Sequence, residues 1–314
     1  MATASAIQNT GISNPGVLLA ANFPDLLDAR FKKIAMRAWA KPTQGLECYD
    51  IVKSSRNYEK FSSVTGLGLV PENEDEDDLS IDYLIQGFDF TITPQTYRQS
   101  VRVTKKMRED DLQGVITQRQ KAIRDSAIRT IEYYCSRPFN TGFTATANFL
   151  ASDGMYFFDS GRYTPDTQQG TWSNLETGAL TGANLATMRV NFRKVTEERG
   201  LVAPLKMGTL IVPPDLEQKA FELTNSDLRS EDAMNAKNWH KNSLKVKVWD
   251  YLTDTDAWFG KADGENDLKW VWRVRPEIKT DNVGSNVDVM YQRVRIRFGQ
   301  GLGVPYIWRA STGA

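Results

Sequence analysis

Residues 207–227, MGTLIVPPDLEQKAFELTNSD, join a short apolar run to an amphipathic segment through two prolines. The run 209–212 is rich in β-branched and aliphatic side chains, which predicts a buried strand. Pro214 suits the first position of a helix, because a proline there removes no intrahelical hydrogen bond. A helix is therefore expected over 215–225, and the stretch predicts a strand-to-helix unit within a mixed α+β fold.

Two segments upstream, 49–64 and 80–106, show strand-like patterns, with alternation clearest at Phe88, Phe90 and Ile92. Arms of roughly 12 residues at ~3.3 Å each would reach ~40 Å, farther than a compact domain needs. An isolated two-stranded ribbon is only marginally stable in water. The sequence thus predicts a long hairpin that rests on a neighbouring subunit.

An acidic run lies between the two arms of this expected hairpin. Its carboxylates are Glu72, Glu74, Asp75, Glu76, Asp77 and Asp78. Such a run repels itself and is typical of a solvated connection. A second hypothesis is electrostatic docking on basic residues of another subunit.

Two helices are expected in the middle of the chain. Glu109, Asp110 and Asp111 open a segment with helical spacing of apolar residues up to Cys135, and Pro138 is expected to end it. About 27 residues at ~1.5 Å each give a rod of ~40 Å. A second helix is expected over 182–199, ended by Gly200.

The two ends of the chain differ in character. Residues 1–48 begin small and polar, and a short amphipathic helix is expected between Pro24 and Pro42. The last third reads as strands. In the final one, three arginines are expected on one side and three apolar residues on the other, with three glycines ending the strand. These residues are Arg293, Arg295, Arg297, then Val294, Ile296, Phe298, and then Gly299, Gly301, Gly303.

Composition disfavours several classes of protein. Lys plus Arg and Asp plus Glu both number 39, so there is no net basic field for dedicated DNA binding. Cys48, Cys135 and the single histidine, His240, lack the spacing of a zinc site. There is no signal peptide and no run of 18 apolar residues, so a soluble protein is expected.

Possible chemistry is weak in this sequence. Asp263, Glu265 and Asp267 lack the full calcium-loop pattern and read as a solvated loop. His240 has no nucleophile beside it and reads as structural or exposed. The tryptophans, among them Trp249, Trp258, Trp270, Trp272 and Trp308, favour core or interface packing over a sugar-binding surface. We expect no enzyme activity and no catalytic, cofactor-binding or metal residues.

Residues 207–227 resemble the strand, proline and helix unit of phage major capsid proteins with the Hong Kong 97 fold. The closing stretch VRIRFGQGLGVPYIWRAS, 294–311, is similar to their last peripheral-domain strand, and the order of elements agrees. The resemblance implies an N-terminal arm over 1–48 and an extended loop over 49–106. It further implies a peripheral domain with a spine helix over 107–145 and 270–314, and an axial domain over 146–269.

The resemblance also implies a function. Such proteins form hexamers and pentamers of an icosahedral shell around double-stranded DNA, so we expect a virion protein assembled in the host cytoplasm. A separate scaffold, a portal and decoration or cement proteins are the implied partners, no cofactor or membrane is expected, and DNA contact would be non-specific. Although Lys60 lies on the expected hairpin, no motif supports a covalent cross-link, and none is expected.

The expected intersubunit contacts are charged residues of the hairpin, the acidic run and the last strand. They are Arg56, Lys60, Glu72, Glu74, Asp75, Glu76, Asp77, Asp78, Arg293, Arg295 and Arg297. Two alternatives remain open at this point. One is an encapsulin-like compartment, which shares the fold. The other is a carbohydrate-active or calcium-dependent enzyme that uses the carboxylates of Asp254, Asp256 and the acidic run.

Overall fold

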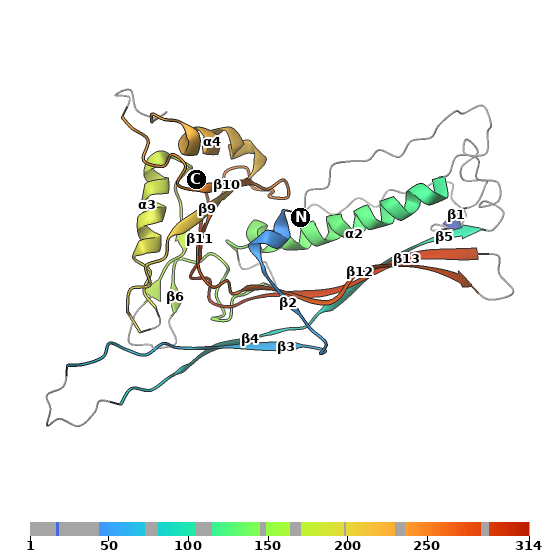
Figure 1. The fold of residues 1–314 in the computed structure, drawn as a ribbon, viewed down its shortest axis with the longest axis horizontal. Helices are drawn as coiled ribbons and strands as arrows, with labels where there is room; N and C mark the ends of the chain where they lie inside the picture. Colours follow the sequence, from blue (N-terminus) through green and yellow to red (C-terminus); the bar gives the residue numbers. More distant parts are fainter. Residues whose placement is uncertain are drawn as a thin grey trace. The chain divides into compact units, whose positions relative to one another are not determined.

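The structure, a computed structural model, describes residues 17–18, 44–72, 81–104, 115–144, 149–163, 171–197, 199–229, 236–283 and 289–313 (Figure 1). The chain divides into two compact units. Unit 1 comprises Met1–Pro42, Gln95–Thr130 and Val274–Phe298, and unit 2 comprises Thr43–Pro94, Ile131–Arg273 and Gly299–Ala314. The four segments expected from the resemblance remain a prediction.

Unit 1 combines an antiparallel pair of strands with a helix. Strand β5 (Gln95–Thr104) pairs with β13 (Val289–Leu302) in a register that runs from Thr104↔Val289 to Gln95↔Phe298. Strand β12 (Leu268–Val283) lies next to β13, and β1 (Val17–Leu18) pairs in parallel with β5. Strand β12 continues into unit 2, as does the helix.

The last long strand has the two faces expected from its sequence. Val294, Ile296 and Phe298 of β13 are buried, whereas Arg293 and Arg295 are exposed and Arg297 is half-buried. The expected end of this strand was wrong, because β13 continues to Leu302. Gly299 and Gly301 lie inside the strand, where a Cβ atom would approach Ile92 to 2.6 Å at either position. These glycines therefore allow close packing inside a strand.

Helix α2 (Val115–Asn140) is the long helix expected from the sequence, and Glu109–Asp111 lie outside the described residues. Pro138 does not end it as expected, but lies in its last turn. A proline there removes one helical hydrogen bond, because it has no N–H to donate. The following Thr141 N–H still donates to the Arg137 carbonyl at 3.1 Å, while Phe139 packs into the core.

Unit 2 contains a mixed sheet in the order β10-β9-β11-β14-β8 among the described residues. Its strands are β8 (Leu175–Glu176), β9 (Met207–Val212), β10 (Lys245–Val248), β11 (Trp258–Ala262) and β14 (Trp308–Ser311). After β9 the chain enters η4 (Pro214–Leu216) and α4 (Glu217–Asn225) and returns as β10, parallel to β9. The strand-to-helix unit expected from residues 207–227 is confirmed.

The core of unit 2 is aromatic. The ring of Phe139 lies at the centre of a buried group and meets four rings edge-on at centroid distances of 5.1–5.3 Å. These rings belong to Phe157, Trp249, Phe259 and Trp308. Trp258, Trp270 and Trp272 are buried as well, so core packing is confirmed for these tryptophans.

Helix α3 (Gly182–Arg193) ends earlier than expected. Beyond it the Ala203 N–H donates to the Val195 carbonyl at 2.8 Å, and Glu197 N–H donates to Leu201 O at 2.7 Å. Gly200 has a φ of +76° and lies in the turn between these paired residues. Its expected role as a helix terminator was wrong, because it serves a tight hairpin, 195–203, which replaces the last helical turns.

The expected long hairpin is shorter than its two arms. Strand β3 (Glu59–Val64) pairs with β4 (Gln86–Ile92), but β2 (Asp50–Lys53) pairs with β12 in parallel. In the second arm, β5 likewise pairs with β13 and not with the first arm. Strand β5 thereby gains two hydrogen-bonded neighbours, β1 and β13, whereas β2 forms an edge of the sheet beside β12.

The remaining described elements are short. They are η3 (Gly45–Cys48), β6 (Arg162–Tyr163) and β7 (Thr171–Trp172). The helix expected between Pro24 and Pro42 lies outside the described residues.

Candidate assembly surfaces

The end of the β3–β4 hairpin is an exposed apolar surface. We call residues 65–72 and 81–85 the loop end. The Thr65 N–H donates to the Ile85 carbonyl at 2.9 Å, which joins its two sides. Its exposed apolar residues are Leu67, Leu69, Val70, Ile81, Tyr83, Leu84 and Ile85. Leu69 is 80% and Val70 94% exposed, so this surface buries little within its own subunit.

Three of the expected contact residues lie on or near this hairpin. Arg56 and Glu72 are exposed. Lys60 is exposed on β3, and its Nζ lies 2.7 Å from the Asp89 carboxylate on β4. Hydrogen bonding to Lys60 is the main reason that the pKa of Asp89 falls to about 2. Glu74, Asp75, Glu76, Asp77 and Asp78 lie outside the described residues.

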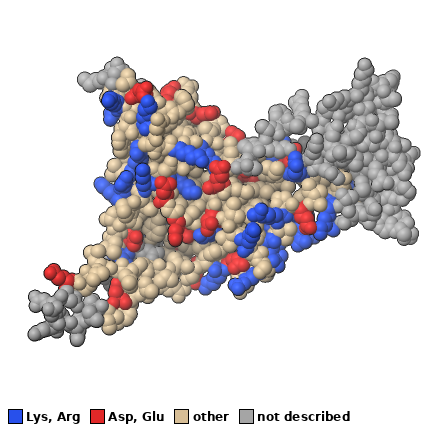
Figure 2. All heavy atoms as spheres, viewed as in Figure 1, with Lys and Arg blue, Asp and Glu red and all other residues tan. Residues whose placement is uncertain are grey.

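A second surface, in unit 1, is strongly cationic. A groove of about 210 Å³ is lined by Arg98, Glu277, Lys279, Arg293, Val294 and Arg295. Arg98 on β5 lies directly opposite Arg295 on β13, and such a like-charged pair is unfavourable unless anions compensate. We call this lining the cationic face. Figure 2 shows Lys and Arg side chains gathered along this part of the molecule.

Glu277 is the carboxylate that lines this groove. The Lys279 Nζ lies 2.8 Å from its Oε1. Hydrogen bonding to Lys279 lowers the pKa of Glu277, and the charges of Arg295 and Arg293 lower it further. Among the described residues that line the groove, four carry a positive charge and one carries a negative charge. The groove is therefore suited to an anionic partner.

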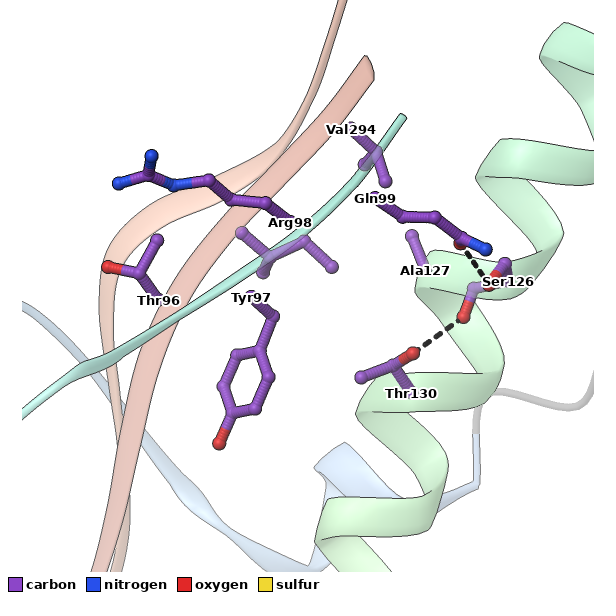
Figure 3. A pocket seen from close by; sticks show the side chains of 9 residues that line it. Thr96, Tyr97, Arg98, Gln99, Ser126, Ala127, Thr130 and Val294 are labelled. Atoms are coloured by element: carbon purple, nitrogen blue, oxygen red, sulfur yellow. Dashed lines mark hydrogen bonds between the residues drawn. The ribbon is translucent and has the colours of Figure 1, made fainter. Parts of the chain in front are cut away.

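A neighbouring groove of about 510 Å³ separates β5 from helix α2 within unit 1 (Figure 3). Gln99 reaches toward the helix, where Ser126 Oγ donates to Gln99 Oε1 at 2.8 Å, whereas Arg98 points away from it. Thr130 Oγ1 donates to the Ser126 carbonyl, also at 2.8 Å. The Ser126–Gln99 bond joins strand to helix, whereas the Thr130–Ser126 bond lies within α2.

Sequence reasoning missed part of both surfaces. It named the arginines of β13 but not Arg98, although Arg98 and Arg102 follow the same alternation in 95–104. It missed Lys279 in 274–279, where Pro276 obscures the period. It also passed over Leu69 and Val70, because a short apolar run cannot by itself be distinguished from a core strand.

The residues weighed for other chemistry have structural roles. His240 is buried, with its Nδ1 3.0 Å from Arg189 Nη1 and its Nε2 3.1 Å from the Gly182 carbonyl. Asp254 Oδ1 accepts the N–H of Asp256 at 3.0 Å, as expected of a turn. In the described ranges, no group of three His, Cys, Asp or Glu residues could hold a metal ion. No helix there is both long and apolar enough to cross a membrane.

Comparison with known proteins gives one family and a set of structures with the same fold. A family model described as phage capsid protein matches residues 89–311. No curated protein matches the chain.

Solved capsid structures cover nearly the whole chain. The capsid of the cyanophage P-SCSP1u matches at a TM-score of 0.64 and 11% identity, over 91% of this chain and 93% of that one. The native GTA particle capsid matches at 0.57 and 12% identity, over 96% and 99%. The capsid of Myoviridae phage XM1 matches at 0.52 and 13% identity, over 96% and 100%.

These matches confirm the mixed α+β capsid fold expected from the sequence, and they do not favour an encapsulin-like compartment or a carbohydrate-active enzyme. The chain belongs to the phage capsid protein family: it is a major capsid protein of the virion, one subunit of a many-membered shell with the Hong Kong 97-like fold.

Proposed function

We propose that this major capsid protein forms hexamers and pentamers of an icosahedral shell around double-stranded DNA, and that its loop end binds a neighbouring copy of the same chain. The observation that carries the second part is the exposure of Leu69 and Val70 on a narrow hairpin. Apolar side chains on a two-stranded ribbon have no core of their own to enter. A second copy supplies the missing surface, and heterologous contacts of this kind close into rings.

Electron microscopy of the purified protein tests the assembly. The expected result is closed shells several hundred ångströms across, empty or filled with DNA. A monodisperse monomer under all assembly conditions would contradict the proposal, and small shells filled with protein cargo would favour a compartment.

Replacing Leu69 and Val70 together with serine should block assembly without weakening the fold. Burying two such side chains contributes roughly 1.5–3 kcal/mol each. Losing both should therefore weaken each subunit contact by about a hundredfold or more. Because both side chains are exposed in the subunit, the urea midpoint of the unassembled chain should stay unchanged.

The matched control is Leu150→Ser, which removes another half-exposed apolar side chain outside the hairpin. This control should assemble normally. Normal shells from the double serine variant would show that the loop end carries no contact.

We further propose that the acidic run pairs with the cationic face of a neighbouring subunit. The run offers the carboxylates of Glu72, Glu74, Asp75, Glu76, Asp77 and Asp78, and β13 offers Arg293, Arg295 and Arg297. Arg56 and Lys60 are further basic contacts in this proposal. Its support is the excess positive charge around the Arg98–Arg295 pair.

Salt should weaken this pairing, because the screening length falls from about 10 Å at 0.1 M to about 3 Å at 1 M ionic strength. Particles should therefore dissociate at lower temperature in 1 M salt, and Arg295→Gln should reduce that salt dependence. Lys219→Gln, an exposed cation on α4, serves as the control and should leave it unchanged. Particle stability that does not depend on salt would contradict the pairing.

The partners we propose are a separate scaffold, a portal and decoration or cement proteins, with assembly in the host cytoplasm. Packaged DNA would meet the shell through weak phosphate contacts that do not depend on base sequence.

A further inference from the structure

Asp82 joins three parts of unit 2 at the loop end. Its Oδ2 accepts the backbone N–H of Gly68 at 2.6 Å, which connects the two sides of the loop. Its carboxylate also accepts from Arg199 Nη1, with 2.6 Å to Oδ1 and 2.7 Å to Oδ2. The Arg199 Nη2 donates to the neighbouring Tyr83 carbonyl at 2.5 Å. Arg199 therefore binds both a side chain and the backbone of the loop.

Arg199 makes these contacts although it lies 117 positions from Asp82 in the sequence. Arg199 lies next to Gly200 in the 195–203 hairpin, which the Ala203–Val195 and Glu197–Leu201 backbone bonds hold together. Gly200 supplies the positive φ that this tight turn needs. The Arg199 side chain therefore extends from a turn that two backbone hydrogen bonds hold together.

The ion pair lies beyond the last regular pairing of the loop. The β3–β4 ladder ends at Val64↔Gln86, and one further backbone bond joins Thr65 to Ile85. Gly68 and Asp82 come next, just before the exposed Leu69, Val70 and Ile81. The Gly68–Asp82 bond and the ion pair therefore lie directly beside Leu69 and Ile81 in the chain.

We propose that Asp82 and Arg199 form a latch that positions the loop end for its contact with a second copy of the chain. This inference rests on the proposed function of the loop end and adds the residues that aim it. The latch fixes the apolar side chains in one direction before subunits meet, so the ordering cost of association is reduced. Arg199 is a positioning residue, since it acts through Asp82 and Tyr83.

A double-mutant cycle tests the latch in the full-length protein. Arg199→Ala, Asp82→Ala and their combination are compared by the rate of shell formation and by hydrogen exchange of the Gly68 amide. Arg199→Ala should speed that exchange roughly threefold and slow assembly by a similar factor, as expected for a partly exposed ion pair. Asp82→Ala should speed the exchange more, because it also removes the acceptor of the Gly68 amide. The double variant should stay close to Asp82→Ala, because without Asp82 the side chain of Arg199 keeps its bond to the Tyr83 carbonyl but has lost its ion pair with the loop. Arg199→Lys should recover part of the effect.

Lys269→Ala is the matched control, because it removes a partly exposed ion pair of similar length, Lys269–Asp50, that lies outside the loop end. It should leave Gly68 exchange and assembly near the native values. Additive effects in the cycle, or an Arg199→Ala variant with native exchange and native assembly rate, would overturn the latch while native shells still form. Failure of the native chain to form shells would instead overturn the proposed function.

Discussion

Replacing Phe139 with alanine should lower the free energy of unfolding by about 3–5 kcal/mol, the usual cost of removing a fully buried phenylalanine. The ring is buried at the end of α2 and contacts Phe157, Trp249, Phe259 and Trp308 at centroid distances of 5.1–5.3 Å. These neighbours come from four separate segments, so they cannot all close the resulting cavity. Urea unfolding of the unassembled chain measures the effect.

Phe221→Ala is the matched control for this prediction. Phe221 is 62% exposed on α4, so its loss should change stability by no more than ~0.5 kcal/mol. If Phe139→Ala cost less than ~1.5 kcal/mol, the rings around Phe139 would not form the rigid centre of unit 2.

Replacing Arg162 with alanine should be similarly costly, at about 3–5 kcal/mol, because it leaves a buried carboxylate without its cation. Arg162 Nη1 lies 2.5 Å from Asp153 Oδ2, and both side chains are fully buried. Its Nε donates to Asn174 Oδ1 at 3.1 Å, and its Nη2 donates to the carbonyls of Phe157, at 3.0 Å, and Tyr156. Burial lowers the pKa of Arg162, and the charge of Asp153 opposes that shift.

The same network reaches β14, since Asn174 Nδ2 donates to the Trp308 carbonyl at 3.3 Å. In thermal and urea unfolding, Arg162→Ala should therefore show one cooperative transition whose midpoint is shifted to lower temperature and lower urea concentration. Combining it with Asp153→Ala should cost less than the sum of the two single changes. Lys241→Ala, which breaks the exposed pair with Asp227, should stay within ~0.5 kcal/mol. Equal effects of Arg162→Ala and Lys241→Ala would contradict this account.

The candidate surfaces were only partly predictable. The two-residue alternation around Arg293, Arg295 and Arg297 was enough to place these arginines on one face, because successive side chains of any strand point to opposite sides. That Arg98 lies opposite Arg295 depends on the register between β5 and β13, which brings together residues almost 200 positions apart. The intersubunit roles of these arginines and of the acidic run stay predictions.

The sequence by itself determined the local elements with a strong period: the long helix α2, the buried strand and helix of 207–227, and the two faces of β13. Each depends on side chains near one another in the chain. Only the tertiary structure decided where α3 ends, why β2 and β5 pair outside the hairpin, and which cation contacts Asp82. In all three cases the deciding partner is a backbone or side chain brought close by folding, such as Val195 by Ala203 or Asp82 by Arg199. Local propensity differs by only a few tenths of a kcal/mol between such alternatives, so long-range hydrogen bonds and burial decide among them.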